Sequence, residues 1–211
     1  LKLYNDLYDE LSEKDRSISF EVIEHTEQVI KKAKAGDGKA AYALYKTAWV
    51  SCSVGRDPDG DYKYDISRPQ HDTAFYKQCI VVTKNLQKNA SMWLELAAQA
   101  GDIRGIMQYA SAMKTINSQK NSNGALNSDE VEYNQKAVSF LNSAANQGVL
   151  DAYINLHSVY SSDKYGLQDK PRGHAYLAAM ALIDANNPYK ALFDESEKQL
   201  NAMEKIRAAE L

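Results

Sequence analysis

The sequence predicts an all-α fold, an α–α superhelix (solenoid) of three to four helix hairpins with a capping helix at each end. Apolar residues recur at helical spacing along most of the chain. In addition, three stretches align on Gly36, Gly101 and Gly148, each with an alanine three residues earlier. Other aligned positions are Val29, Leu94 and Leu141 at −7, Ala40, Gly105 and Ala152 at +4, and Leu44, Tyr109 and Leu156 at +8. A register kept three times over about 20 residues indicates a repeat array.

The N-terminal part of the chain predicts a short capping helix over 1–16, followed by the first hairpin. An apolar stripe marks the capping helix, at Leu3, Leu7 and Leu11. A second helix over 17–35 ends at Gly36, where the left-handed backbone favours glycine. Asp37 then caps a helix over about 39–51. A turn this short predicts an antiparallel pair of helices.

The middle of the chain predicts a long loop and a second hairpin. Residues 53–70 are dense in Gly, Pro and Asp and show no period, which indicates an inserted loop. A helical pattern resumes near His71 and breaks at Asn89, which can cap the following helix. Helices over about 90–100 and 103–117 then form the second hairpin.

A third hairpin follows a second polar insertion at 118–128. Ser128 is expected to cap a helix over 129–147, with acidic residues in its first turn. This helix pairs with one over 150–162.

The C-terminal part predicts a degenerate fourth repeat and a terminal cap. Pro171 opens the fourth-repeat helix, since a proline at the first helical position leaves no hydrogen bond unmade. A single long capping helix is expected over 188–211, and no β pattern persists anywhere. The domain prediction is therefore one helical-repeat domain over 1–211, with repeats in 17–187.

Composition argues against some classes of partner. The net charge of −3 and the pI near 5.8 disfavour nucleic acid, which needs a clustered basic surface. Residues 1–30 are the most acidic part, which is typical of a solvated helix face or of a surface for a basic partner. No apolar run has the roughly 18 residues that cross a bilayer, so no transmembrane segment is expected. A presequence could have been removed before Leu1.

The sequence predicts no catalytic, cofactor or metal site. Nucleophile and metalloprotease motifs and phosphate-binding glycine loops are missing from it. Carboxylates at Asp57, Asp59, Asp61 and Asp65 resemble the start of a calcium loop, but Gly60 is misplaced for an EF-hand and position 12 is Arg68 instead of Glu. We therefore interpret this segment as a solvated acidic loop. Cys52 and Cys79 fit neither a redox pair nor a zinc site, and they could be two buried thiols or one disulfide.

The repeat resembles that of the Sel1-like family, relatives of the tetratricopeptide repeats. The third copy matches best, with Ala137, Phe140, Ala144, Ala145, Gly148, Ala152, Leu156, Tyr160, Tyr165, Gly166, Leu167 and Asp169 at the family's positions. The glycines lie 65 and 47 residues apart, so two units carry insertions, and the match covers roughly residues 20–187. The resemblance implies a bacterial protein of the periplasm or a secreted one, and it favours a Cys52–Cys79 disulfide.

The resemblance also implies a non-catalytic scaffold or adaptor of the cell envelope that binds a protein or peptide on its concave face. Aromatic side chains give large contact areas with few rotamers. Those expected to anchor a partner are Tyr42, Tyr45, Trp49, Tyr109 and Tyr153. The alternatives are a structural envelope protein that associates with itself, and an enzyme or inhibitor that binds cell-wall material.

Overall fold

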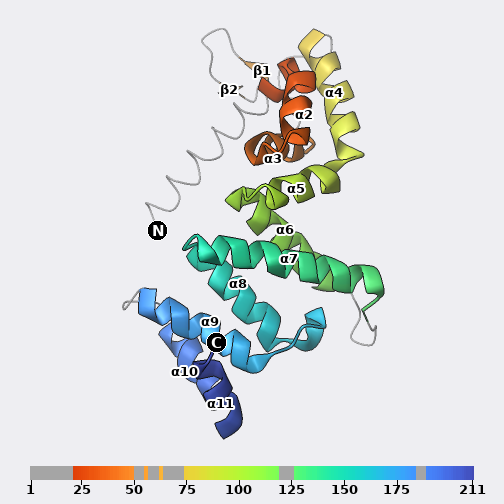
Figure 1. Ribbon diagram of the computed structural model, residues 1–211. Coiled ribbons are helices and arrows are strands. Elements are labelled where there is room, and N and C mark those ends of the chain that lie inside the picture. Colours follow the sequence, from red (N-terminus) through yellow and green to blue (C-terminus); the bar gives the residue numbers. More distant parts are fainter. Residues whose placement is uncertain (1–20, 50–54, 57–61, 64–73, 119–125, 184–188) are drawn as a thin grey trace. The chain divides into compact units, whose positions relative to one another are not determined.

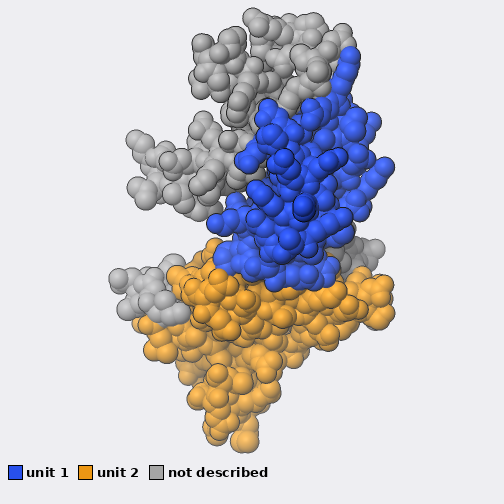
Figure 2. All heavy atoms as spheres, turned by 45° about the horizontal axis from the view of Figure 1, so that its top comes forward, with its two compact units in different colours: residues 1–105 blue, residues 106–211 orange. Residues whose placement is uncertain are grey.

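The computed structural model describes residues 21–49, 55–56, 62–63, 74–118, 126–183 and 189–211 (Figure 1). Helices dominate these residues, which confirms the predicted all-α class. The chain divides into two compact units, Leu1–Gly105 (unit 1) and Ile106–Leu211 (unit 2), shown in different colours in Figure 2. The helix predicted over 1–16 lies outside the described residues, and the single-domain boundaries 1–211 stay a prediction.

Unit 1 contains two helix pairs and the start of a further helix. Its helices are α2 (Thr26–Lys34), α3 (Gly38–Thr47), α4 (Ala74–Gln87), α5 (Ala90–Gln99) and the first residues of α6 (Ile103–Ser118). Figure 1 shows α2 and α3 in orange-red and α4 in yellow, with α5 beside them. Residues 21–24 are also helical.

The helix predicted over 17–35 is wrong as a single element, because the described part of it breaks at His25. His25 has φ −123° and ψ 32°, which is not helical, and α2 begins after it. The hydroxyl of Thr26 donates to the carbonyl of Val22 at 2.7 Å and contacts that of Ile23 at 3.2 Å. Such a hydroxyl offers the backbone a partner other than the helical amide, which favours a bend.

The described residues also contain a short β ladder, which no sequence pattern indicated. Within the predicted loop 53–70, β1 (Gly55–Arg56) and β2 (Tyr62–Lys63) form a two-residue antiparallel ladder. Gly55 pairs with Lys63 and Arg56 pairs with Tyr62. A ladder this short needs no extended alternation of apolar residues, which is the pattern that predicts a strand.

Unit 2 contains the rest of α6 and a further run of helices. They are α7 (Ser128–Asn146), α8 (Leu150–Ser161), the 3-10 turn η2 (Asp163–Tyr165), α9 (Lys170–Ile183), α10 (Lys190–Lys198) and α11 (Ala202–Ala209). α8 packs between α7 and α9, and both α10 and α11 pack against α9.

The N-cap of α7 is Asn127, so the predicted cap at Ser128 is wrong by one residue. The Asn127 side chain accepts from the Glu130 amide at 2.9 Å, and the Glu130 carboxylate accepts from the Asn127 amide at 2.8 Å. This reciprocal capping box satisfies two amides at the start of the helix. Ser128 could not form it, because the residue three positions later is Val131.

The single helix predicted over 188–211 is wrong, since the described residues form two helices, α10 and α11. A second capping box separates them. Asn201 accepts from the Glu204 amide at 3.0 Å, and the Glu204 carboxylate accepts from the Asn201 amide at 2.9 Å. The spacing of an Asn three residues before a Glu was the available signal for this new helix start.

Three glycines end their helices in the same way, as predicted. Gly36, Gly101 and Gly148 have φ of 96°, 79° and 81°. After each, the next amide donates to a carbonyl five residues back, as from Asp37 to Lys32 at 3.1 Å. The glycine amide itself donates to the alanine three residues earlier, at 2.8–3.1 Å. These are Schellman turns, and a positive φ is the reason that glycine occupies each.

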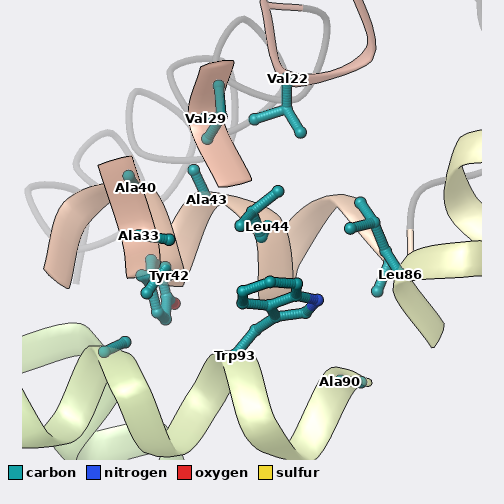
Figure 3. Close-up of a cluster of buried hydrophobic side chains, with 13 residues drawn as sticks. Val22, Val29, Ala33, Ala40, Tyr42, Ala43, Leu44, Leu86, Ala90 and Trp93 are labelled. Atoms are coloured by element: carbon teal, nitrogen blue, oxygen red, sulfur yellow. The ribbon is translucent and has the colours of Figure 1, made fainter. Parts of the chain in front are cut away.

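The core of unit 1 lies where α3 faces α5. Figure 3 shows Trp93 of α5 pointing toward Leu44 of α3, with Leu86 beside them. Trp93 and Leu44 are 3% and 0% exposed. The Trp93 indole Nε1 is buried without a hydrogen-bond partner, which costs about 1–3 kcal/mol. The apolar contacts of the large ring offset that cost.

Small residues hold the helices of unit 2 close together. Ala144, Ala145 and Ala152 are 0%, 3% and 0% exposed, and Leu141 and Leu156 fill the space around them. Because protein interiors are close-packed, a larger side chain at an alanine position has no space to enter.

We expect Ala152→Leu to lower the free energy of unfolding by about 1–3 kcal/mol, because the added atoms overpack the α7–α8 contact. Ala191 of α10 is exposed, so the control Ala191→Leu should stay within about 0.5 kcal/mol of the parent. Denaturant unfolding followed by circular dichroism measures both. Equal midpoints for Ala152→Leu and the parent chain would contradict the close helix approach.

Candidate functional site

The candidate site is a hollow of about 620 Å³ in unit 1, called here the unit 1 hollow. Three segments line it: residues 21–32, α3 with its N-cap, and the turn that leads into α6 with the first residues of that helix. The lining residues are Glu21, Val22, Val29, Lys32, Asp37, Lys39, Ala40, Tyr42, Ala43, Lys46, Gly101, Asp102, Ile103 and Arg104.

The lining combines an apolar surface with charged side chains. Val22 and Val29 come from the residues before and within α2, and Ala40 and Ala43 from α3. All four are at most 9% exposed, so they form the deep part of the hollow. Alanines at these two positions of α3 leave space that a larger side chain would fill. A site of this kind can take an apolar group and fix its orientation through charges.

Arg104 is the basic group of the hollow that two neighbours, Asp102 and Tyr42, hold in place. Its Nη2 and Nε donate to the Asp102 carboxylate at 3.0 and 3.3 Å. Its Cζ also lies 4.6 Å from the centroid of the Tyr42 ring, in the range of a cation–π contact. The guanidinium is thus fixed on two sides, while 41% of the side chain is exposed.

Asp37 and Asp102 are both occupied as helix caps. Asp37 Oδ1 accepts from the Ala40 amide at 3.0 Å, and Asp102 Oδ1 accepts from the Gly105 amide at 3.1 Å. The carboxylates therefore offset the positive N-terminal ends of α3 and α6. The predicted cap at Asp37 is confirmed.

The structure places three predicted partner-binding aromatics on one face of α3 or directly after it. Tyr42 is buried at 8% exposed, and its ring lines the hollow beneath Arg104. Tyr45 is half-buried with its ring 6.2 Å from that of Tyr42, and Trp49 is 63% exposed. Tyr45 and Trp49 are outside the lining of the hollow. Their role as partner anchors stays a prediction.

Tyr109 and Tyr153 lie in unit 2 instead. Tyr109 is 3% exposed, stacks on Tyr133 with centroids 4.3 Å apart, and meets the edge of Phe140 at 5.2 Å. Tyr109 thus packs inside unit 2, and its role as a partner anchor stays a prediction. Tyr153 is half-buried, and its hydroxyl donates to the Ala145 carbonyl at 3.0 Å.

Cys79 of α4 is buried at 1% exposed, and no free cysteine occurs among the described residues. Cys52 lies outside them, as do Asp57, Asp59, Asp61 and Asp65. The Cys52–Cys79 pairing stays a prediction. Within the part of the chain that the structure describes, no group of three or more His, Cys, Asp or Glu is placed to hold a metal ion.

Sequence reasoning missed the basic side chains of the hollow. Lys39 and Lys46 are seven residues apart on α3, which places them on the same helix face. That spacing was the available signal. Lys32 and Arg104 carry no such signal, because they join the site only through the fold.

Unit 2 holds a buried polar cluster that resembles a nucleophile and base. Ser161 Oγ lies 3.2 Å from His157 Nδ1. However, the same nitrogen lies 3.0 Å from the Gly173 carbonyl, which can only accept. Nδ1 must therefore carry the proton, so it cannot take one from Ser161. The pair is a structural hydrogen bond and is not an activated nucleophile.

A second histidine of unit 2 is buried near the first. His174 Nδ1 lies 3.3 Å from Ser196 Oγ, and its ring stacks on Phe193 with centroids 4.7 Å apart. Burial lowers the pKa of both His157 and His174. The hydrogen bond to the Gly173 carbonyl acts in the opposite direction and raises the pKa of His157. The charge of Glu197 raises the pKa of His174, whereas the charges of His157 and Lys205 lower it further.

We expect the stability of unit 2 to fall under acidic conditions. A lowered pKa means that the unfolded state binds protons more readily, so the histidine contribution is complete above about pH 6.5 and is lost as the pH falls through the folded-state pKa. Denaturant unfolding between pH 7.5 and 5.0 measures this change. His157→Gln should reduce the change, whereas the exposed His25→Gln should retain it. An identical pH profile for His157→Gln and the parent would contradict the assignment.

No family model, curated protein or solved structure matches this chain. The Sel1-like resemblance therefore stays a prediction. In the described segments, no helix is both long enough and apolar enough to span a bilayer.

Proposed function

We propose that the chain is a non-catalytic scaffold that binds a segment of a partner protein in the unit 1 hollow. One observation carries the proposal: an apolar surface and fixed charges meet in a hollow of about 620 Å³. Sites that bind a peptide side chain need an apolar contact and a few placed polar groups. Arg104 supplies such a group, because Asp102 and the Tyr42 ring hold it in place.

The proposal includes a Sel1-like repeat solenoid in the bacterial periplasm or outside the cell. The three Schellman turns and the small residues around them support the repeat. Stacked helical repeats present extended binding surfaces, which fits a scaffold. The location follows from the family resemblance alone.

A photoreactive amino acid placed at Glu21 tests the binding site. Glu21 is exposed and lines the hollow, whereas Glu195 of α10 is exposed and lies in unit 2. In a native extract, we expect the full chain with the probe at Glu21 to join a protein that the probe at Glu195 does not join. Mass spectrometry identifies the product. The same products at both positions, or none at Glu21, would oppose a partner in the hollow.

Self-association is a second candidate function, and one feature of α11 and the residues after it favours it. Met203, Ile206 and Leu211 are 74%, 56% and 58% exposed. Met203 and Ile206 are three residues apart on α11, so they share a helix face, and exposed apolar patches are typical of an interface. A second copy of the chain could bury them.

Sedimentation velocity over a range of concentrations tests this candidate. We expect a concentration-dependent oligomer, and we expect the double variant Met203→Ser, Ile206→Ser to weaken it at least tenfold. The control Leu182→Ser removes a side chain of α9 that is 89% exposed, and it should leave the association unchanged. A monomer at every concentration would eliminate the candidate.

A further inference from the structure

We propose that the unit 1 hollow selects an acidic segment of its partner protein. An apolar side chain of that segment enters the hollow, and neighbouring carboxylates face Lys32 and Lys39. This inference rests on the proposed function and specifies the chemistry of the partner.

The lysines supply the charge preference. Lys32 of α2 and Lys39 of α3 are exposed, and both line the hollow. Neither forms an ion pair with an acidic side chain of the described residues. Lys46 and Arg104 add two further cations to the lining. Because Arg104 is paired with Asp102, the charge preference comes from Lys32 and Lys39.

The three lining carboxylates differ in how far they reduce this charge. Asp37 and Asp102 accept backbone amides at the starts of α3 and α6, and Asp102 also binds Arg104. The helix ends offset part of both charges, and Arg104 is the ion-pair partner of Asp102. Glu21 is the lining carboxylate without such a role among the described residues. Lys32 and Lys39 thus outnumber this one glutamate in the lining, and they supply the attraction for an anion.

The apolar part of the hollow distinguishes a peptide from a simple anion. Val29, Ala40 and Ala43 present carbon atoms to the hollow and are each at most 9% exposed. A free phosphate would leave this surface unfilled. An acidic peptide with a leucine or a similar residue buries the apolar surface and places carboxylates at the rim. Charge complementarity across such a contact sets specificity and the rate of association.

Three labelled twelve-residue peptides test the inference by fluorescence anisotropy on the full chain. Each carries three leucines at the same positions, and the other residues are Asp and Glu, Asn and Gln, or Lys. We expect the acidic peptide to bind at least tenfold more tightly than its amide counterpart. The lysine peptide should bind weakest. Added salt should weaken the acidic complex most, because exposed charges are screened.

A matched pair of variants locates the effect. The double variant Lys32→Glu, Lys39→Glu should weaken the acidic peptide at least tenfold and leave the amide peptide unchanged. Lys190→Glu is the control, because Lys190 is also exposed near the start of a helix, in unit 2. Circular dichroism checks that the double variant is folded. If the double variant is not folded, the single variants Lys32→Glu and Lys39→Glu replace it in the same binding measurement.

The outcomes separate this inference from the proposed function. If the amide peptide binds as tightly as the acidic one, or if the segment joined at Glu21 is basic, the acidic selection is wrong while partner binding stands. If Glu21 joins no protein, the proposed function itself fails. If the chain forms a dimer that the acidic peptide dissociates, then a second copy of the chain occupies the hollow. That result would point to self-association in place of a partner protein and would overturn the inference.

Discussion

The close approach of helices over glycine and alanine is the constraint on which unit 1 depends. A Cβ at Gly38 would lie 2.9 Å from the Ala100 Cβ, and one at Gly105 would lie 2.7 Å from the Ala97 Cβ. The starts of α3 and α6 therefore both rest on the end of α5. This shared contact brings Tyr42 within reach of Arg104. The same cation–π pair lines the hollow, together with Ala40 and Ala43 of α3.

The fixed position of Arg104 also bears on how tightly the hollow could bind. A long basic side chain loses rotamer freedom when a ligand orders it, and that loss weakens binding. In unit 1 the loss is incurred during folding, because Asp102 and Tyr42 already hold the guanidinium. Lys32 and Lys39 are exposed and lack such constraints among the described residues. We therefore assign orientation of the ligand to Arg104 and attraction to the lysines.

The features that the sequence predicts well are the local ones. The glycine turns follow from an αL position at the end of an apolar period, and Asp37 follows from capping chemistry. The helix break at His25 was missed, because the hydrogen bond from the Thr26 hydroxyl to the Val22 carbonyl does not change the spacing of apolar residues in the sequence. The start at Asn201 was missed because apolar spacing continues across it.

The candidate site was less accessible to sequence reasoning. Its charged groups come from α2, α3 and the start of α6, and only the folded chain brings Lys32, Lys39 and Arg104 together. Sequence reasoning also did not show that Tyr109 is buried. Helical spacing places a ring on a face of the helix, but it does not tell whether Tyr133 and Phe140 will cover that face. Burial of a large side chain is decided by its neighbours in the fold.

The two tryptophans of the chain have a spectroscopic consequence. Trp93 and Trp49 both belong to unit 1, at 3% and 63% exposed. Indole emission therefore has a shielded component and a component open to collisional quenchers, and neither originates in unit 2. Emission reports on unit 1, whereas far-ultraviolet ellipticity sums the helices of both. A difference between the two melting curves would reveal whether the two halves of the chain unfold in one cooperative step.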